Sequence, residues 1–582
     1  MLGDMGSDPN LHFSDPADID DFVAHLHKFE RGEMTPDQFK VYRLGRGTYG
    51  QRQADVNMLR VKIPQGILSA EQCEAIAVVA DEYSRGFGHI TTRQNIQLHF
   101  VQLSRAAEAM RVLDKVGLTT KEACGSTVRN VTGCALAGVC SGAPFDVTPY
   151  GQATTRFFLR NPICQALPRK FKIAFSGCGD DCAQGAINDV GLLAMIVDGV
   201  RGFRVRVGGG LSTSPEDAHP LEDFVPADRL LATIEAIVRV FDRTGNRENK
   251  SRARLKYVIR KIGMDGLRAE YQKELAGITA EGRAVNPIDA STETGPDAVL
   301  RIGKAPRQLE SAGEPGYEAW ARTNCLRQKQ AGYYAVVVRL DRGDITSAQL
   351  RGLAKLAREF SDGTVRATNE QNMIIRFVPE ASLSALHAAL LALDLGLPGA
   401  RTIKDVTACP GADTCNLAVT KSRELATAIS AKLETANGAL VGAEKLDVKI
   451  SGCPNSCGQH HVAALGFHGT MRRVGGTAVP EYQLHLGGGI SKEGATFGRQ
   501  VVKVPARRVG DTVVRLLELY QRDKQPEEAA LDFFRRVEPA TVKAFVADLS
   551  AFDEKTAKPE DYLDNGDEAK FVVAIGQGEC AV

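Results

Sequence analysis

Two stretches of the chain, residues 58–103 and 335–378, share one pattern of apolar and polar positions. Each begins with an apolar run of strand length, turns at a glycine (Gly66 or Gly343), and continues with apolar residues at the period of an amphipathic helix. Each ends in a second apolar run after a Gln-Asn pair, which starts at Gln94 or Gln371. The glycines and the glutamines are both 277 residues apart. The pattern therefore predicts a β-α-β layer that occurs twice.

Cysteine spacing extends the repeat beyond these layers. In each copy, two cysteines with five residues between them precede two with three residues between them, and the third cysteine follows the first by 44 positions. The quartets are Cys134, Cys140, Cys178 and Cys182, and Cys409, Cys415, Cys453 and Cys457. Each copy then reaches a strand that ends in three glycines, within 203–212 and 482–491. We therefore expect an α+β fold in which one two-layer unit is internally duplicated with pseudo-two-fold symmetry.

The repeat also predicts the domain boundaries. A polar stretch with glycine and proline, 278–317, separates the two copies and is typical of a linker. We expect an N-terminal extension (1–44), β-α-β half-domains (45–118 and 326–398), cysteine-bearing domains (119–275 and 399–536), a linker (276–325) and a C-terminal tail (537–582).

Composition narrows the class of protein. The 582 residues are enough for about three to five domains, and 43% hydrophobic with 25% charged residues is ordinary for a globular chain. The net charge of +1 lacks the basic excess of a nucleic-acid binder. The acidic N-terminus has no signal-peptide pattern, and no apolar run is long enough to span a membrane. We expect a cytoplasmic protein with neither nucleic acid nor membrane as a partner.

In a reducing cytoplasm, grouped cysteines bind metal or carry out redox chemistry more often than they form disulfides. The second quartet lies in two short segments, TACPGADTC and SGCPNSC, which present four soft ligands suited to an iron–sulfur cluster or to zinc. The spacing fits zinc knuckles poorly. The alternative is that these cysteines are small buried apolar residues, which the matched spacing disfavours.

Five motifs resemble one known family. They are the spacing from Cys409 to Cys415, the sequence CPNSC at 453–457, and TTRQNIQ (91–97), VRNVTGC (128–134) and LPRKFKI (167–173). Together they resemble the sirohaem-dependent nitrite and sulfite reductases, over about residues 40–535. The resemblance implies ferredoxin-like half-domains and sirohaem/[4Fe–4S] domains, each present twice.

The resemblance also implies roles for residues. Cys409, Cys415, Cys453 and Cys457 would hold a [4Fe–4S] cluster, and Cys457 would also bridge to the sirohaem iron. Asn455 and Arg169 would contact the sirohaem. Arg93, Arg129, Lys170 and Lys172 would bind the substrate anion and deliver protons. On its own, the Lys-Phe-Lys segment would be an ordinary solvated strand face, with Phe171 turned into the core.

The second copy lacks these cations at two of the four equivalent positions. It has Glu370 opposite Arg93, Lys404 opposite Arg129, Lys445 opposite Lys170 and Asp447 opposite Lys172. Acids would repel an anionic substrate. We infer that the first copy supplies the anion pocket and the second supplies the cluster.

Lys172 favours one substrate. Sulfite reductases of the resembled family typically have a second lysine at this position, and the nitrite enzymes an asparagine. We therefore expect six-electron reduction of sulfite to sulfide, with nitrite reduction to ammonia as the alternative. A non-catalytic cofactor-binding subunit and a simple electron carrier are alternatives from other classes. No nucleotide-binding glycine motif follows a strand, so the electrons would come from ferredoxin or a separate flavoprotein.

Two features have no place in this scheme. The complete first-copy quartet (Cys134, Cys140, Cys178 and Cys182) is either a remnant of the duplication or the site of a second cluster. Cys580, third from the end, is either a mobile thiol that meets a partner or an untethered terminal residue.

Overall fold

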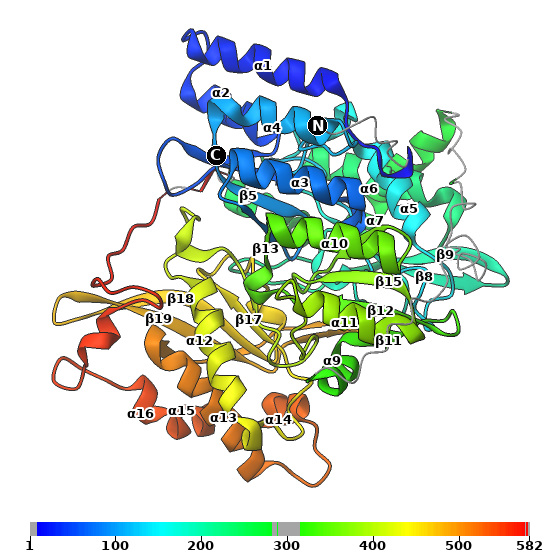
Figure 1. Cartoon of the computed structure of the whole chain (residues 1–582). Coiled ribbons are helices and arrows are strands. Elements are labelled where there is room, and N and C mark those ends of the chain that lie inside the picture. The colour runs from blue at the N-terminus through cyan, green and yellow to red at the C-terminus, as the bar shows by residue number, and fades with distance from the viewer. Residues whose placement is uncertain (1–8, 282–287, 289–314, 577, 580–582) are drawn as a thin grey trace.

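The computed structural model describes residues 9–281, 288, 315–576 and 578–579. Two β-α-β layers lie side by side, and a domain with its own five-stranded sheet follows each of them (Figure 1). The expected duplicated α+β fold is confirmed. None of the helices within these ranges has both the length and the apolar character that a membrane span requires.

The ferredoxin-like layers have the same elements in the same order. The first contains β1 (Thr48–Gly50), β2 (Val56–Val61), β3 (Ile67–Ser69), α3 (Ala70–Tyr83), β4 (Phe87–Ile90), β5 (Ile96–Gln102) and α4 (Ala106–Asp114). The second contains β11 (Cys325–Arg327), β12 (Tyr333–Val338), β13 (Asp344–Thr346), α10 (Ser347–Phe360), β14 (Thr364–Ala367), β15 (Met373–Pro379) and α11 (Leu383–Leu391). The helices α3 and α10 begin at equivalent capping boxes, Ser69 with Gln72 and Thr346 with Gln349.

The two layers exchange a strand, a feature for which the sequence pattern has no signal. The strand β3 pairs with β14 of the other copy, and β13 pairs reciprocally with β4. As a result the sheet orders are β1-β2-β5-β4-β13 and β11-β12-β15-β14-β3. Helices α3 and α10 pack against each other, and the two layers share one hydrophobic core. Neither layer is complete without the other.

The glutamines of the repeated Gln-Asn pairs lie at equivalent points across this symmetry. The Gln94 amide donates to the backbone oxygen of Ala367 at 3.0 Å, and the Gln371 amide donates to that of Ile90 at 2.9 Å. These reciprocal bonds show the pseudo-two-fold relationship directly.

The cysteine-bearing domains share the order of their main strands and helices, and the second has an additional two-stranded sheet, β20-β21. The first contains β6 (Thr132–Gly133), α5 (Thr148–Phe158), β7 (Ile173–Ser176), β8 (Val190–Val197), β9 (Val200–Val207), β10 (His219–Pro226), α6 (Leu230–Thr244) and α7 (Leu255–Ala280). The second contains β16 (Thr407–Ala408), α12 (Ser422–Thr435), β17 (Val448–Ser451), β18 (Leu465–Val474), β19 (Thr477–Leu486), β20 (Gly489–Ser491), β21 (Gly494–Thr496), β22 (Arg499–Pro505), α13 (Val509–Asp523) and α14 (Ala530–Arg536). Each has a separate hydrophobic core.

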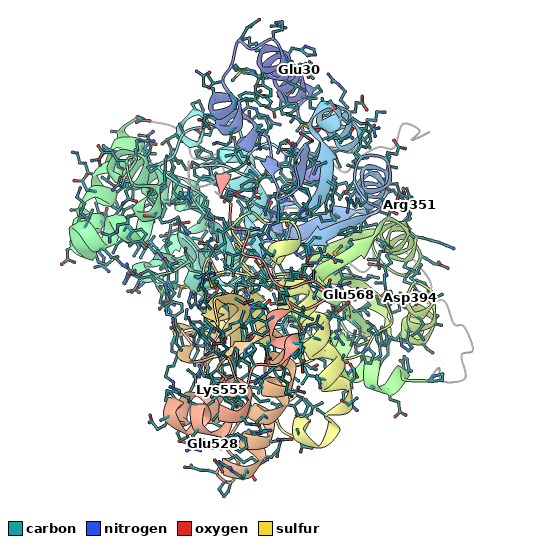
Figure 2. All side chains as sticks on the ribbon, turned by 90° about the vertical axis from the view of Figure 1, so that its left-hand side faces the viewer. Glu30, Arg351, Asp394, Glu528, Lys555 and Glu568 are labelled. Atoms are coloured by element: carbon teal, nitrogen blue, oxygen red, sulfur yellow. The ribbon has the colours of Figure 1, made fainter. Side chains whose placement is uncertain are left out.

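The segments outside the repeat contain further helices, α1 (Pro16–Glu30), α2 (Pro36–Leu44), α9 (Tyr317–Asn324), α15 (Pro539–Phe545) and α16 (Ala547–Ser550). The predicted linker, 276–325, therefore begins inside α7 and includes α9. The helix continues to Ala280 because Leu275 and Ile278 are buried in the core of the first cysteine-bearing domain. Seen from the side, Glu30 and the pair Glu528 and Lys555 lie at opposite ends of the molecule (Figure 2).

Candidate active site

Four cysteines of the second copy lie on two neighbouring loops. Cys409 follows β16 and Cys453 follows β17, and these strands pair in parallel, so both loops leave the same edge of the sheet. Cys409 and Cys453 are buried, Cys415 is partly buried and Cys457 is exposed. The second quartet therefore has three cysteines that are shielded from solvent and one, Cys457, that is exposed.

The four thiols affect one another electrostatically. Burial, and then the neighbouring Cys457, raises the pKa of Cys409 to about 12. The same two causes raise the pKa of Cys415 and of Cys453. Four thiolates this close together need positive charge between them, and thiolate is the ligand that iron–sulfur clusters use. The donor set fits a [4Fe–4S] cluster.

The loop of Arg93 lies against the last of these cysteines. The Thr92 hydroxyl donates a hydrogen bond to the backbone oxygen of Cys457 at 2.9 Å. The Arg93 guanidinium donates to the Asn188 side chain at 2.5 Å and to the backbone oxygen of Asn130 at 2.6 Å. The first copy thus places a cation-bearing loop beside the exposed cysteine of the second.

Lys172 lies within this group of cations. Burial lowers the pKa of its ammonium well below the ordinary value, and the charges of Arg93 and Arg254 lower it further. The charge of Lys170 also lowers this pKa, whereas the charge of Asp189 raises it. An anion bound here would restore the charged form of Lys172, so the pocket is suited to an anionic ligand.

Asp189, which belongs to none of the sequence motifs, holds the pocket together. Its buried carboxylate accepts two bonds from Arg254, at 3.0 Å and 2.8 Å, and one from the backbone N–H of Lys172 at 2.8 Å. A bidentate pair of this kind fixes both partners. Arg254 and Asp189 are 65 positions apart, and each resembles an ordinary surface charge in the sequence.

The remaining predicted pocket residues lie around this group. Phe171 is buried and packs against Phe241, so Lys170 and Lys172 flank a core residue in the extended segment that leads into β7. The Arg129 guanidinium donates to the backbone oxygen of Ala123 at 2.9 Å. The charge of Arg129 also lowers the pKa of Arg93, after the larger effect of burial.

The two residues expected at the sirohaem lie on different loops. Arg169 is partly buried and lies close enough to Lys250 to lower the pKa of that ammonium, second to burial. Asn455 lies between two cluster cysteines, and its side-chain oxygen accepts a hydrogen bond from the Ser212 hydroxyl at 3.4 Å. Asn455 therefore offers a polar group beside the cluster cysteines, and Arg169 offers a cation next to Lys170 in the sequence.

The equivalent positions of the second copy do not form an anion pocket. Lys404 pairs with Glu434 at 2.7 Å, and Lys445 is exposed. The Asp447 carboxylate accepts the backbone N–H of Ala464 at 2.7 Å. Glu370 lies near Cys182 and contributes to the raised pKa of that thiol.

Comparison with known proteins places this geometry in a family. The model of the nitrite and sulphite reductase 4Fe–4S domain matches residues 124–278 and 399–538, and the model of the ferredoxin-like half domain of these reductases matches 49–116 and 326–393. The chain belongs to the nitrite and sulfite reductase family. Sirohaem and a [4Fe–4S] cluster are the cofactors of this family and of this reductase.

Similar members of the family have different named substrates. The reductase is 30% identical over 493 residues to the assimilatory ferredoxin-dependent nitrite reductase of Haloferax mediterranei, with 81% of each chain covered. It is 30% identical to the ferredoxin sulfite reductase of Mycobacterium tuberculosis, with 84% and 83% covered. The solved structure of the Mycobacterium tuberculosis NirA protein matches with a TM-score of 0.76 at 27% identity, over 91% of this chain and 96% of that one.

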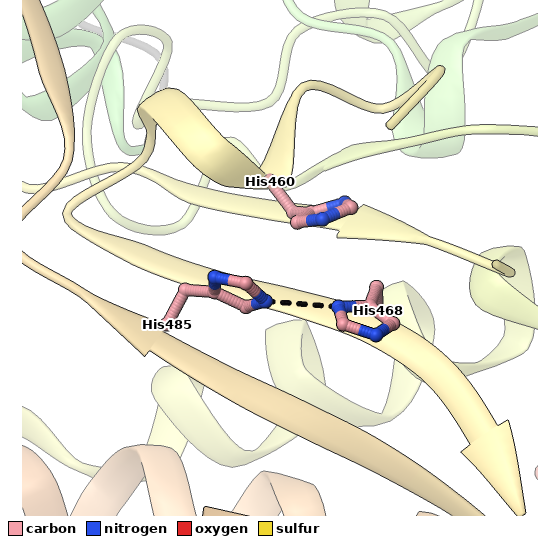
Figure 3. Close-up of side chains that lie close together, drawn as sticks. All are labelled: His460, His468 and His485. Atoms are coloured by element: carbon pink, nitrogen blue, oxygen red, sulfur yellow. Dashed lines mark hydrogen bonds between the residues drawn. The ribbon is translucent and has the colours of Figure 1, made fainter. Parts of the chain in front are cut away.

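A cluster of three histidines in the second copy has no signal in the sequence. His460, His468 and His485 come from three elements, and their rings lie together (Figure 3). Burial lowers the pKa of His468 to about 4 and that of His485 to about 3, so the rings are neutral. Nδ1 of His468 and Nε2 of His485 are 2.8 Å apart and hydrogen-bonded.

The C-terminal tail of the reductase returns to the first copy (Figure 1). The Glu579 carboxylate forms a partly buried ion pair with Arg43 and accepts the backbone N–H of Gly50 at 2.6 Å. Gly576 donates its N–H to the backbone oxygen of Asn416, which neighbours Cys415. Cys580 lies outside the described residues, but the chain just before it is held in place.

Proposed function

We propose that this reductase converts sulfite to sulfide in a six-electron reaction, with ferredoxin as the electron donor. The observation that carries the proposal is the position of Lys172. It is a second lysine in a pocket that also holds Arg93 and Arg254, next to the loop whose Thr92 contacts Cys457. A pocket with several fixed cations favours the more highly charged of the two candidate anions.

The residues of the pocket would act before and during reduction. Arg93 would bind and orient the oxygen atoms of the anion, because its guanidinium is held by Asn188 and Asn130. Lys172 would take up a proton as the anion binds and donate it to a departing oxygen, which leaves as water once the solvent has supplied a second proton. When bound, sirohaem and the cluster supply the electrons and the site at which the substrate is reduced.

Cluster ligation is assigned to Cys409, Cys415, Cys453 and Cys457. The support is their shared loop geometry and the absence of disulfides among the described cysteines. Cys457, the exposed member, would also be the thiolate shared with the sirohaem iron. Free thiols throughout the described residues agree with a reducing compartment, and we place the enzyme in the cytoplasm.

Nitrite is the second candidate substrate. Relatives of similar identity include ferredoxin nitrite reductases of Haloferax mediterranei and Synechococcus elongatus. The same pocket would bind nitrite and form ammonia. The second lysine at position 172 is the feature that favours sulfite over nitrite.

Product stoichiometry tests the proposal. The purified enzyme, with sirohaem and cluster loaded, is given sulfite and reduced ferredoxin under anaerobic conditions. We expect one sulfide for every six ferredoxins oxidised. A chlorin-type absorption band that shifts when sulfite is added would show an accessible haem. A band that does not shift would indicate a non-catalytic subunit, and no band would indicate an electron carrier.

A further inference from the structure

The first-copy quartet repeats the burial pattern of the second. Cys134 is buried, Cys140 is partly buried, Cys178 is buried and Cys182 is exposed. The second copy has the same order of exposure, from Cys409 to Cys457. A quartet that only filled a core would have no reason to keep one exposed thiol at the equivalent position.

The backbone holds the first pair of cysteines in the same way in both copies. The Cys134 N–H bonds to the oxygen of Phe175 at 3.0 Å, and the Cys409 N–H bonds to that of Ile450 at 3.2 Å. Likewise, the Cys140 N–H bonds to the oxygen of residue 136 at 3.0 Å, and the Cys415 N–H bonds to that of residue 411 at 3.0 Å. In both cases the two carbonyl partners are 275 positions apart, which is also the separation between the two quartets.

The second pair lies on loops of matching conformation. The residue before the fourth cysteine has a left-handed backbone in both copies, with φ of 50° at Asp181 and 58° at Ser456. The Ser176 hydroxyl accepts the N–H of Ala183 at 3.2 Å, and the Ser451 hydroxyl accepts the equivalent N–H of residue 458 at 3.1 Å. Non-glycine residues pay a conformational cost in this region, so two such loops indicate a shared requirement.

Backbone N–H groups point at two sulfurs of each copy in the same pattern. In the first copy, the N–H groups of residues 142 and 143 favour the thiolate of Cys140, and that of Asp180 favours the thiolate of Cys178. In the second copy, the N–H groups of residues 417 and 418 favour the thiolate of Cys415, and the N–H group of Asn455 favours that of Cys453. Hydrogen bonds to sulfur are a standard means of stabilising and tuning an iron–sulfur cluster.

The four sulfurs of the first copy are also close together. Hydrogen bonds link Cys140 to Cys178, Cys178 to Cys182, and Cys182 to Cys134, and none of these thiols forms a disulfide. The sulfurs of Cys178 and Cys182 lie within 4.8 Å of each other and of an oxygen of Asp180. The carboxylate of Asp181 is turned away, because it accepts bonds from Ser176 and from two backbone N–H groups.

We propose that Cys134, Cys140, Cys178 and Cys182 bind a second [4Fe–4S] cluster. The proposal rests on the assignment of the second-copy quartet as the cluster ligands of the proposed function. Glu370 lies near Cys182, at the position equivalent to Arg93. Asp447, at the position equivalent to Lys172, accepts the backbone N–H of Ala464. The second cluster therefore has no anion pocket, and its site does not reduce sulfite or nitrite.

Iron and acid-labile sulfide, measured per chain on anaerobically purified enzyme, test this directly. Sirohaem iron is determined separately from the haem absorbance. We expect about eight non-haem irons and about eight sulfides in the wild type. Cys178→Ser is expected to lose about four of each and to keep the haem band and its shift on addition of sulfite. Cys453→Ser is expected to lose the other cluster and to alter the haem band.

Cys325→Ser is the matched control, since Cys325 is a partly buried free cysteine outside both quartets. It should keep the full iron and sulfide content. About four non-haem irons in the wild type would overturn the proposal. So would one zinc per chain that is lost in Cys178→Ser, or an unchanged iron content in that variant. Loss of the first-copy cluster alone leaves the proposed reductase function intact, so the two failures are distinguishable.

Discussion

The side-chain amide of Gln459 donates a hydrogen bond to the side-chain oxygen of Gln184, its equivalent in the other copy. Gln459 lies two residues after Cys457, and the Gln184 backbone oxygen accepts a bond from Asn188 at 2.6 Å. Asn188 in turn holds Arg93. The pair thus connects the cluster loop of one copy to the anion pocket of the other, across the pseudo-two-fold axis.

This connection predicts energetic coupling between the two glutamines. Either Gln184→Leu or Gln459→Leu leaves a buried amide without its partner and should lower the free energy of unfolding by about 1–3 kcal/mol. The loss of unfolding free energy in the double variant should be about 1 kcal/mol smaller than the sum of the losses in the two single variants. Denaturant unfolding of the four proteins measures this. Gln272→Leu, on the exposed side of α7, should change stability little. Strict additivity would contradict the coupling.

The substitution Lys172→Asn should change the preference between anions. It removes a positive charge from the pocket, and this costs the more highly charged anion more binding energy than it costs nitrite. We expect the ratio of kcat/KM for sulfite to kcat/KM for nitrite to fall by about tenfold or more, which is about 1.4 kcal/mol. Steady-state rates with both anions and one donor give the ratio. An unchanged ratio would remove Lys172 from the account of specificity.

The pH dependence of binding should depend on Lys172. Burial and the charges of Arg93 and Arg254 lower its pKa, so the ammonium is charged below that pKa and becomes neutral as the pH rises through it. KM for sulfite should therefore rise toward alkaline pH. In Lys172→Arg the guanidinium stays charged, and the rise should be weaker, while kcat falls because a guanidinium is a poor proton donor.

Titration of sulfite itself is the same for both proteins and cancels when the variant is compared with the wild type at each pH. Lys170→Arg provides a second comparison, since Lys170 flanks the same core residue, Phe171. Identical pH profiles of KM for the wild type and Lys172→Arg would show that another group controls binding.

Asp189→Asn should destabilise the pocket. The carboxylate is fully buried and pairs with Arg254, so its neutralisation leaves a buried guanidinium uncompensated, at about 3–5 kcal/mol. It should also lower the pKa of Lys172 further, because Asp189 acts to raise that pKa. The rise of KM should then begin at a lower pH. Asp548→Asn, which disrupts an exposed pair with Arg515, should cost less than about 1 kcal/mol.

The duplication and the cysteine groups could be predicted from the sequence because both appear as fixed spacings along the chain. The sequence did not reveal the exchange of β3 and β13, since strands of three residues are too short to show a period. Asp189 and Arg254 were missed because they meet only through the fold. The histidines of β18 and β19 and the preceding turn were missed for the same reason, since no common spacing joins them.

Comparison of the two copies within one chain was informative where single motifs were not. Lys172 and Asp447 occupy equivalent positions, but one faces a group of cations and the other binds a backbone N–H. The two cysteine quartets have the same order of burial, whereas Glu370 near the first quartet stands where Arg93 stands in the other copy.

The most direct test of the central claim is the specificity constant of the purified enzyme, with both cofactors loaded, for sulfite and for nitrite. Reduced ferredoxin serves as the donor in both assays. The pocket around Lys172 predicts a kcat/KM that is higher for sulfite, with sulfide as the product. A kcat/KM clearly higher for nitrite, with ammonia as the product, would contradict it.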